Sequence, residues 1–279
     1  MKVTLVYPGI TICGFNSYGR DMDSSWISHG LCSISASAKK AGFDVKLIDL
    51  RTLKNWEEFE NRIKSEKPDI VGITMMSVDY NPAMKCFEII KKINPGIVTV
   101  VGGPHPSICP NEVKDSKNID HVITGEGEIS FVELLNKISG GLKPEKIIVG
   151  KPPDINALPF VDRELFSDME YPIATFLNRP FVTLIAGRGC RYNCNFCQPA
   201  ERLIFGRKVR RRSVDNVIAE LKILRDKYNF KSLLIHDDCL TEDKEWVFDF
   251  CDEYKKNKLD QPFVCQSRAE QTLYAKMRI

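Results

Sequence analysis

The first half of the chain alternates short, nearly continuous apolar runs with stretches in which apolar residues recur every three or four positions. The runs predict buried strands, and five of them occur, at residues 3–7, 44–50, 70–77, 97–101 and 121–124. The stretches between them predict amphipathic helices that end at glycine or proline, as at Gly42 and Pro68. Strands that are apolar throughout are typical of a parallel sheet with helices on both faces. We therefore predict an α/β fold with a doubly wound, five-stranded parallel sheet.

Distinctive residues follow these predicted strands at their carboxyl ends, where open parallel sheets bind ligands. They include a long first loop at residues 8–28 and, after the later strands, Ser77, Gly102, Gly103, His105, Gly125 and Glu126. Glycines allow a bulky ligand to approach the backbone closely, although each of them could simply form a tight turn. This edge of the sheet is therefore the candidate binding site of the first half.

The second half begins after residues 141–180, where repeated Gly and Pro pairs suggest a linker between domains 1–140 and 181–279. Strands are predicted at 181–186, 230–235 and 262–266, with helices between them that begin after the expected N-caps Ser213 and Thr241. This βα repeat predicts the first half of a partial (β/α) barrel, with about three units. Such barrels carry their catalytic groups at the carboxyl ends of the strands.

Three cysteines, Cys190, Cys194 and Cys197, lie on the glycine-rich segment that leaves the first of these strands. Thiolates are soft ligands, so iron-sulfur and zinc chemistry come first. A closed zinc site needs a fourth ligand, for which the chain could offer Cys239, Cys251, Cys265 or His236. A [4Fe-4S] cube held by three cysteines instead leaves one iron open to a small molecule.

The order Cys-x3-Cys-x2-Cys, with the aromatic Phe196 just before the last cysteine, resembles the signature of the radical S-adenosylmethionine (SAM) enzymes. The resemblance implies that the three cysteines hold a [4Fe-4S] cluster and that Phe196 contributes to the cofactor site. It also implies that SAM chelates the open iron and is cleaved there to a 5'-deoxyadenosyl radical.

Together with this motif, residues 1–140 resemble the cobalamin-binding domain that precedes the barrel in B12-dependent radical SAM enzymes. The resemblance implies a flavodoxin-like or Rossmann-like domain with cobalamin on the carboxyl edge of the sheet. The expected contacts are Ser77, Gly102, Gly103, His105, Gly125 and Glu126. The Asp-x-His-x-x-Gly motif of other B12 proteins is absent, because Ile27-Ser28 precedes His29-Gly30. We therefore expect cobalt without a histidine ligand from the first loop.

Four residues at the ends of the second and third barrel strands are candidate SAM contacts. Asp237 and Asp238 lie where radical SAM enzymes contact the methionine amine, although the usual Gly-Gly-Glu is absent. A carboxylate suits an ammonium group, but an acidic pair could also complement the dipole of the following helix. Gln266 and Arg268 could bind the carboxylate or the ribose of SAM.

Composition limits the other classes of function. With 43% hydrophobic and 28% charged residues and a net charge of +3, the chain resembles a globular protein without a strong affinity for nucleic acid or membrane. The basic run 207–212 could grip RNA phosphates, but it lacks interleaved aromatics. We expect a solvated face, from which one arginine could turn toward the active site. Pro8 interrupts the first apolar run too early for a secretory signal. We expect a cytoplasmic protein with reduced thiols.

The resemblance implies an enzyme that transfers a methyl group to a carbon centre of a small molecule or peptide, with a flavodoxin or ferredoxin as electron donor. The alternatives are a cobalamin-dependent cyclase or rearrangement enzyme, a methylthiotransferase acting on tRNA, and a non-catalytic corrinoid-binding or zinc-binding module. The methylthiotransferase would need a second cluster, for which Cys13, Cys32 and Cys86 could be offered.

The family's barrel has six βα units, whereas this chain ends at Ile279 inside the expected third helix. A half barrel would leave an unpaired strand edge and uncovered apolar helix faces. We therefore expect a fragment of a longer protein, the alternative being a partner that completes the barrel.

Overall fold

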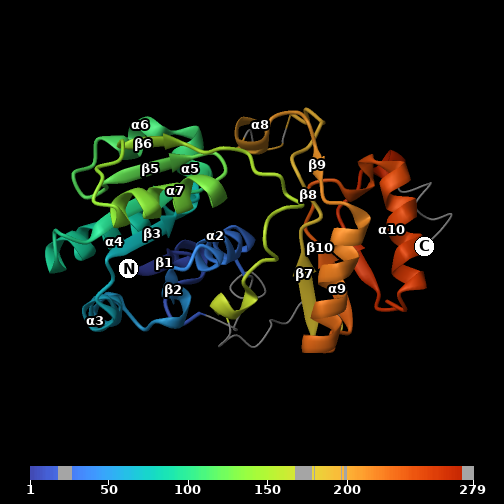
Figure 1. The fold of residues 1–279 in the computed structure, drawn as a ribbon, viewed down its shortest axis with the longest axis horizontal. Coiled ribbons are helices and arrows are strands. Elements are labelled where there is room, and N and C mark those ends of the chain that lie inside the picture. The colour runs from blue at the N-terminus through green and yellow to red at the C-terminus, as the bar shows by residue number, and fades with distance from the viewer. Residues whose placement is uncertain (18–26, 167–177, 179, 196, 198–199, 272–279) are drawn as a thin grey trace. The chain divides into compact units, whose positions relative to one another are not determined.

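The computed structural model describes residues 1–17, 27–166, 178, 180–195, 197 and 200–271 (Figure 1). The chain divides into two compact units. The first comprises residues 1–153 and 158–172, and the second comprises residues 154–157 and 173–279. The chain therefore passes from one unit to the other three times, after residues 153, 157 and 172.

The first unit is built on a six-stranded sheet with the order β2-β1-β3-β4-β5-β6, in which all neighbouring strands are parallel. Its strands are β1 (Lys2–Tyr7), β2 (Asp44–Asp49), β3 (Ile70–Thr74), β4 (Val98–Gly102), β5 (His121–Thr124) and β6 (Ile147–Val149). The five predicted strands are confirmed, but the predicted number is wrong, because β6 comes from the segment expected to be a linker. This strand has only three residues and lies at an exposed sheet edge, so it lacks the long buried run that marks the others.

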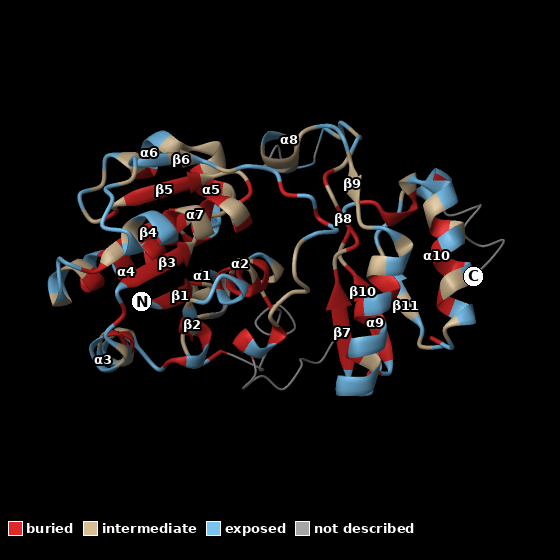
Figure 2. Cartoon of the chain, viewed as in Figure 1, coloured by how far each residue is buried: buried red, intermediate tan, exposed pale blue. Residues whose placement is uncertain are grey.

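Helices cover both faces of this sheet, as a doubly wound fold requires. They are α1 (Ile10–Cys13), α2 (His29–Lys40), α3 (Trp56–Glu66), α4 (Tyr80–Ile93), α5 (Pro104–Ile108), α6 (Pro110–Lys114) and α7 (Glu128–Ser139). One apolar core includes Phe59 of α3 and Phe87 of α4, and a separate core includes Leu31 of α2 and Phe131 of α7. Figure 2 shows the strands buried between the partly exposed helices.

The segment after β6 adds a further piece to the first unit. Its backbone returns to α2, where the Asp162 amide donates to the Cys32 carbonyl at 3.0 Å. The Asp162 carboxylate accepts from Ser35 Oγ and pairs with Lys39 Nζ, both at 2.6 Å. Leu165 and Phe166, in the 3-10 turn Arg163–Phe166, are buried in the core on this face. Proline and glycine content alone suggested a linker because this packing depends on contacts with residues more than a hundred positions earlier.

The second unit contains a parallel three-stranded sheet with the order β11-β10-β7. Its strands are β7 (Phe181–Leu184), β10 (Ser232–Ile235) and β11 (Phe263–Cys265). A second, antiparallel pair is formed by β8 (Gly187–Arg188) and β9 (Arg210–Arg211). The helices are α8 (Ala200–Phe205), α9 (Val214–Tyr228) and α10 (Lys244–Lys256). The strand-helix repeat predicted from the sequence is confirmed.

Helix starts in this unit follow from local capping. Ser213 Oγ accepts from the Asn216 amide at 3.2 Å, which confirms Ser213 as the N-cap of α9. The expected cap Thr241 is wrong: Asp243 caps α10, its carboxylate accepting from the Trp246 amide at 3.1 Å. Thr241 is instead buried in the 3-10 turn Leu240–Glu242 that precedes the helix. Both residue types accept well at an N-cap, so the sequence alone does not choose between them.

A buried ion pair lies at the carboxyl ends of β1 and β2. The Arg51 guanidinium donates to both oxygens of the Asp49 carboxylate, from Nε at 3.0 and 3.2 Å and from Nη2 at 2.6 Å. It also lies over the Tyr7 ring, 4.3 Å from the ring centroid. The backbone carbonyl of Arg51 holds the first loop, accepting from the Ser17 amide at 3.1 Å. Because the Arg51 side chain is only 1% exposed, the pair is a fixed part of this end of the sheet.

We predict that Arg51→Met destabilises the first unit by about 3–5 kcal/mol, because it leaves the Asp49 carboxylate buried without a counter-charge. The matched control is Arg62→Met on α3, whose side chain is 51% exposed and pairs with Glu66 at 3.7 Å. That change should cost about 0–1 kcal/mol. Hydrogen exchange of β1 and β2 peptides across a urea series measures both, and equal losses would contradict the prediction.

Candidate functional site

The carboxyl edge of the first sheet brings together most of the residues predicted there. Because β3, β4 and β5 are neighbours, Ser77, Gly103 and Gly125 follow adjacent strand ends. Ser107 of α5 links two of them, since its Oγ donates to the Gly103 carbonyl at 2.8 Å and accepts from the Gly125 amide at 2.8 Å. Gly102 ends β4, and its carbonyl accepts from the Met75 amide at 2.9 Å. These hydrogen bonds connect the backbone segments that follow β3, β4 and β5.

Gly103 is needed at this edge for both conformation and space. Its φ of 102° lies in the region that favours glycine. A Cβ there would lie 2.9 Å from Thr74 Oγ1 and 3.1 Å from the Met75 amide nitrogen. No side chain can therefore be added without moving the end of β3, so glycine is needed here for the turn to pack against that strand.

Two of the predicted contacts, His105 and Glu126, lie beneath the edge, each only 5% exposed. His105 Nδ1 lies 3.1 Å from Ser77 Oγ, and its ring packs edge-on against Tyr80 with centroids 5.3 Å apart. Its Nε2 lies 3.4 Å from a Glu112 carboxylate oxygen. His105 is therefore arranged to orient Ser77 from below.

Sequence reasoning missed two apolar side chains at this edge. Met76 and Val78 flank Ser77 and are 46% and 49% exposed, although they follow a buried strand directly. The expected strand at residues 70–77 hid them, because β3 ends at Thr74 and the next residues turn into the 3-10 turn Ser77–Asp79. Exposed apolar side chains at a sheet edge are suited to a large flat ligand.

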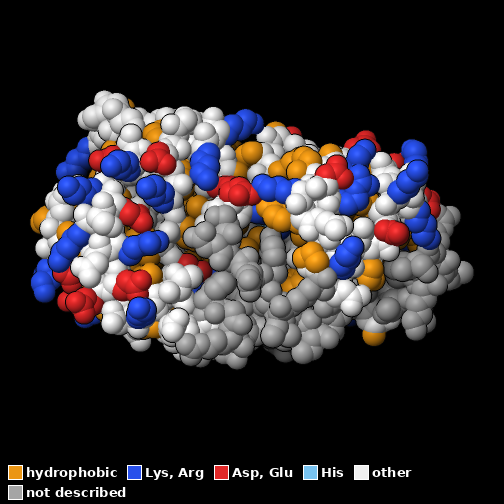
Figure 3. Space-filling model, turned by 90° about the horizontal axis from the view of Figure 1, so that it is seen from below, with side chains coloured by type: hydrophobic (Ala, Val, Ile, Leu, Met, Phe, Trp, Pro, Cys, Tyr) orange, Lys and Arg blue, Asp and Glu red, His pale blue; other side chains and the backbone are white. Residues whose placement is uncertain are grey.

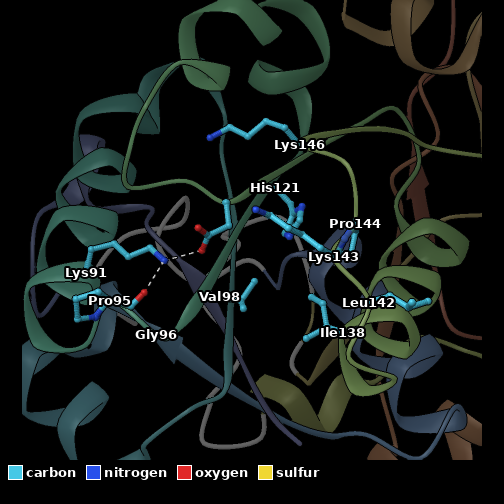
Figure 4. Close-up of a pocket in the computed structure, with 11 residues that line it drawn as sticks. Lys91, Pro95, Gly96, Val98, His121, Ile138, Leu142, Lys143, Pro144 and Lys146 are labelled. Carbon is cyan, nitrogen blue, oxygen red and sulfur yellow. Dashed lines mark hydrogen bonds and ion pairs between the residues drawn. The ribbon is translucent and has the colours of Figure 1, made fainter.

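A cavity of about 410 Å³ opens at the other edge of the sheet (Figure 4). It is lined by residues around the starts of β4 and β5 and the segment after α7, including Lys91, His121 and Lys146. Lys91 Nζ is already bound to Asp120 at 2.6 Å and to the Ile97 carbonyl at 2.7 Å. Lys146 Nζ donates to the Ser116 carbonyl at 3.1 Å. Lys91 and Lys146 thus hold neighbouring chain segments here, and the residues predicted for binding lie at the opposite edge.

The cysteine segment of the second unit begins at β8, directly after β7. Cys190 and Cys194 are partly buried and Cys197 is exposed, and the Cys197 amide donates to the Cys194 carbonyl at 3.0 Å in a tight turn. Burial raises the pKa of the Cys190 thiol. Over the described part of the chain, no three cysteine, histidine or acidic side chains are gathered closely enough to hold a metal ion. The expected contact Phe196 lies outside the described residues.

Arg268 lies beside this segment and contacts one of the three thiols. Its Nη1 donates to Cys194 Sγ at 3.3 Å, and its guanidinium lies over the Tyr192 ring, 4.2 Å from the centroid. The Tyr192 hydroxyl in turn accepts from the Gln271 amide nitrogen. Gln266 is exposed, and its carbonyl accepts from the Leu240 amide at 3.0 Å. The end of β11 is therefore connected to the cysteine segment through Arg268.

The two aspartates after β10 differ in their surroundings. Asp238 is exposed, whereas Asp237 is 4% exposed and engaged by its own chain. Asp237 Oδ1 accepts from the Ala186 amide at 2.7 Å, and Oδ2 pairs with Arg211 Nη1 at 3.0 Å. Burial raises the pKa of Asp237 to about 6, against the opposing effects of the backbone amides and Arg211. These contacts favour a structural role for Asp237, whereas Asp238 is accessible at the surface.

The expectation that residues 207–212 form a solvated basic face is wrong for its last two arginines. Arg211 and Arg212 are 9% and 13% exposed and pair with Asp237 and Glu220. They turn inward because β9 returns alongside β8. Elsewhere, on the face shown in Figure 3, basic and acidic side chains are interspersed.

Two of the three cysteines offered for a second cluster, Cys32 and Cys86, lie far from each other. Cys32 lies in the core containing α2 and Cys86 in the separate core containing α4, so the sheet lies between them and they cannot share a cluster. Burial raises the pKa of Cys32 to about 12 and that of Cys86 further. Cys239 Sγ donates to Gln271 Oε1 at 3.0 Å in a buried contact.

Comparison with known proteins matches a family model to the first half and finds relatives over most of the chain. Residues 18–135 match the family of the B12 binding domain. A methyltransferase of Pyrococcus horikoshii that is called uncharacterized is 32% identical over 250 residues, which cover 84% of this chain and 53% of the relative. The solved structure of OxsB, a cobalamin-dependent SAM radical enzyme, superposes with a TM-score of 0.73 at 19% identity, covering 94% of this chain and 38% of OxsB. The first half of the chain thus matches the B12 binding domain, and over most of its length the chain is similar to a cobalamin-dependent SAM radical enzyme.

The chain is also similar to the anaerobic magnesium-protoporphyrin IX monomethyl ester cyclase of Rubrivivax gelatinosus. The two are 25% identical over 279 residues, covering 93% of this chain and 49% of the cyclase. The chain thus spans about half the length of these curated relatives. The fold expected of a cobalamin-binding radical SAM protein, a B12-type sheet followed by a βα repeat, is confirmed. None of the described helices is both long and apolar enough to cross a membrane.

The raised pKa of Asp237 predicts how stability depends on pH. Because the folded chain holds this proton more tightly than the unfolded chain, the stabilisation is present in acid and is lost as pH rises from about 4 to about 6. Relative to Asp237→Asn, which cannot titrate, wild type should lose up to about 3 kcal/mol between about pH 4 and about pH 7. Hydrogen exchange of β7 and β10 peptides in urea measures the difference, and parallel pH profiles would rule it out.

Proposed function

We propose that this protein is a cobalamin-dependent radical SAM methyltransferase that methylates a carbon centre of a small molecule or peptide. The observation that carries the proposal is the presence on one chain of two features, the glycine-containing carboxyl edge of a B12-type sheet and a Cys-x3-Cys-x2-Cys loop after β7. The chain spans about half the length of these curated relatives, so its activity, its substrate and its partners are proposed here by similarity.

Cobalamin would lie at the carboxyl edge of the first sheet. The exposed side chains of Met76 and Val78 offer apolar contact to the corrin, and the Gly103 backbone, packed against the end of β3, lies beside them. Ser77, held from below by His105, offers a hydroxyl to a polar group of the ligand. When bound there, cobalamin would supply the methyl group, while the protein would bind and orient it.

The [4Fe-4S] cluster would be held by Cys190, Cys194 and Cys197. The donor set fits, because three soft thiolates on one loop satisfy three irons and leave the fourth for the amino and carboxylate groups of SAM. When bound, the cluster would supply an electron to SAM. Arg268, at 3.3 Å from Cys194 Sγ, carries a positive charge beside the thiolates and is suited to the carboxylate of SAM. Asp238, exposed at the end of β10, is suited to its ammonium group.

Methyl transfer is favoured over cyclisation by the closer of the two similarities, at 32% against 25% identity. The cyclase reaction is the second candidate, because similarity to the cyclase extends over 93% of this chain. An external flavodoxin or ferredoxin would supply electrons, and a cytoplasmic location would keep the thiols reduced. SAM carrying a labelled methyl group distinguishes the two reactions, because only a methyltransferase moves the label into product.

The cluster proposal predicts which cysteines are needed for iron. After anaerobic reconstitution, wild type should hold about four irons per chain, and Cys190→Ala, Cys194→Ala or Cys197→Ala should abolish cluster assembly. Cys239→Ala and Cys251→Ala are matched controls that should leave iron content unchanged. Iron analysis and absorption spectra measure the outcome. An iron loss in Cys239→Ala as large as in Cys194→Ala would mean four cysteine ligands, and zinc alone would contradict the proposal.

The cobalamin proposal predicts an effect of charge at the carboxyl edge. Met76→Glu should weaken binding of added cobalamin at least about tenfold, because it replaces apolar contact with a carboxylate that must lose its water. Leu142→Glu is the control, since Leu142 is 64% exposed but lines the cavity at the opposite edge. Titration followed by the corrinoid absorption band measures both. Equal affinities for the two variants would refute the assigned site.

A further inference from the structure

The cysteine loop is closed at its base by two very short strands. In the pair β8 and β9, Gly187 lies opposite Arg211 and Arg188 opposite Arg210, so the segment that carries the three cysteines and α8 begins and ends at this pair. The Arg212 amide extends the base by donating to the Ala186 carbonyl at 2.8 Å. A pair of two-residue strands is too short to hold a long loop by itself. The base therefore needs side chains to fix it.

One buried carboxylate, that of Asp237, reaches both sides of this base. Its Oδ1 accepts from the Ala186 amide at 2.7 Å on the side entering β8. Its Oδ2 pairs with Arg211 Nη1 at 3.0 Å on the side of β9. A Cβ on Gly187 would lie 3.1 Å from Asp237 Oδ2, so the glycine allows the carboxylate to fit. Asp237 thus ties the end of β10 to both ends of the loop.

Arg211 completes the connection to the following segment. Its Nη2 donates to the Cys239 carbonyl at 3.2 Å, and its guanidinium lies over the Trp246 ring of α10, 5.0 Å from the centroid. Glu242 lies near both Arg211 and Arg191, at 3.9 Å and 3.4 Å, and Arg191 belongs to the loop itself. A planar guanidinium can serve several acceptors at fixed angles, which an ammonium group cannot.

We propose that Arg211 and Asp237 are positioning residues, which fasten the base of the cysteine loop so that Cys190, Cys194 and Cys197 can face one iron-sulfur cluster. This inference rests on the proposed function. It assigns Asp237 to the protein's own backbone rather than to SAM, and it gives the basic run a role other than solvation or nucleic-acid binding. Neither residue touches the cluster, so their effect acts through the geometry of the loop.

The test measures how firmly the reconstituted protein holds iron. Arg211→Gln, which keeps polar atoms but removes the charge, should lose iron to an excess of chelator at least about tenfold faster than wild type. Arg211→Lys should lose iron at a rate between those of wild type and Arg211→Gln. An ammonium group can pair with Asp237 but cannot also reach the Cys239 carbonyl. Arg207→Gln removes an exposed charge from the same basic run and should behave as wild type.

A second variant and a second readout separate positioning from general loss of stability. Asp237→Asn keeps the shape of the side chain and should also release iron faster, with a changed electron paramagnetic resonance spectrum of the reduced cluster. Hydrogen exchange of β7 and β10 peptides verifies that each variant is folded. Folded Arg211→Gln and Asp237→Asn proteins that hold iron as long as wild type would overturn this inference alone. A wild-type chain that takes up no iron would overturn the proposed function and this inference together.

Discussion

Parallel strand pairing is the constraint on which both units depend, because it places every carboxyl end of a sheet at the same edge. In the first unit this edge collects the backbone of Gly103, the hydroxyl of Ser77 and two exposed apolar side chains. In the second unit the ends of β7 and β10 are brought beside each other in the same way. Residues far apart in sequence thereby become neighbours without any direct sequence signal of their own.

Charge inside each unit is used to fix backbone at these edges. Asp49 and Arg51 form a pair that holds the loop after β1, and Asp237 and Arg211 form a pair that holds the loop after β7. In both pairs the arginine also lies over an aromatic ring, Tyr7 in one and Trp246 in the other. Burying two charges is costly unless further hydrogen bonds satisfy them. Here the residues of each pair also form hydrogen bonds to the backbone, at Ser17 in the first unit and at Ala186 in the second.

Sequence patterns predicted the features that depend on local order. The buried strands were recognisable by continuous apolar runs, and the cysteine motif by its spacing. Strand β6 was missed because three residues at an exposed edge give no such run. The sequence did not identify Arg211 as an inward-facing arginine of the basic run, because its position depends on antiparallel pairing with Gly187, which lies on the other side of the cysteine loop. The role of Asp237 could not be predicted either, since a carboxylate at a strand end can face a ligand or the backbone.

The return of residues 158–166 to α2 bears on where the chain can be divided for separate expression. A boundary at residue 140 would remove β6 and the Asp162 contacts with Ser35 and Lys39 from the first unit. A boundary at residue 166 keeps them but takes residues 154–157 away from the second unit, where Asn156 Oδ1 accepts from the Ser213 amide at 2.8 Å. The two units exchange short segments of the chain, so either single cut separates one unit from residues that belong to it. Fragments expressed from such a cut would each differ from the corresponding unit of the intact chain.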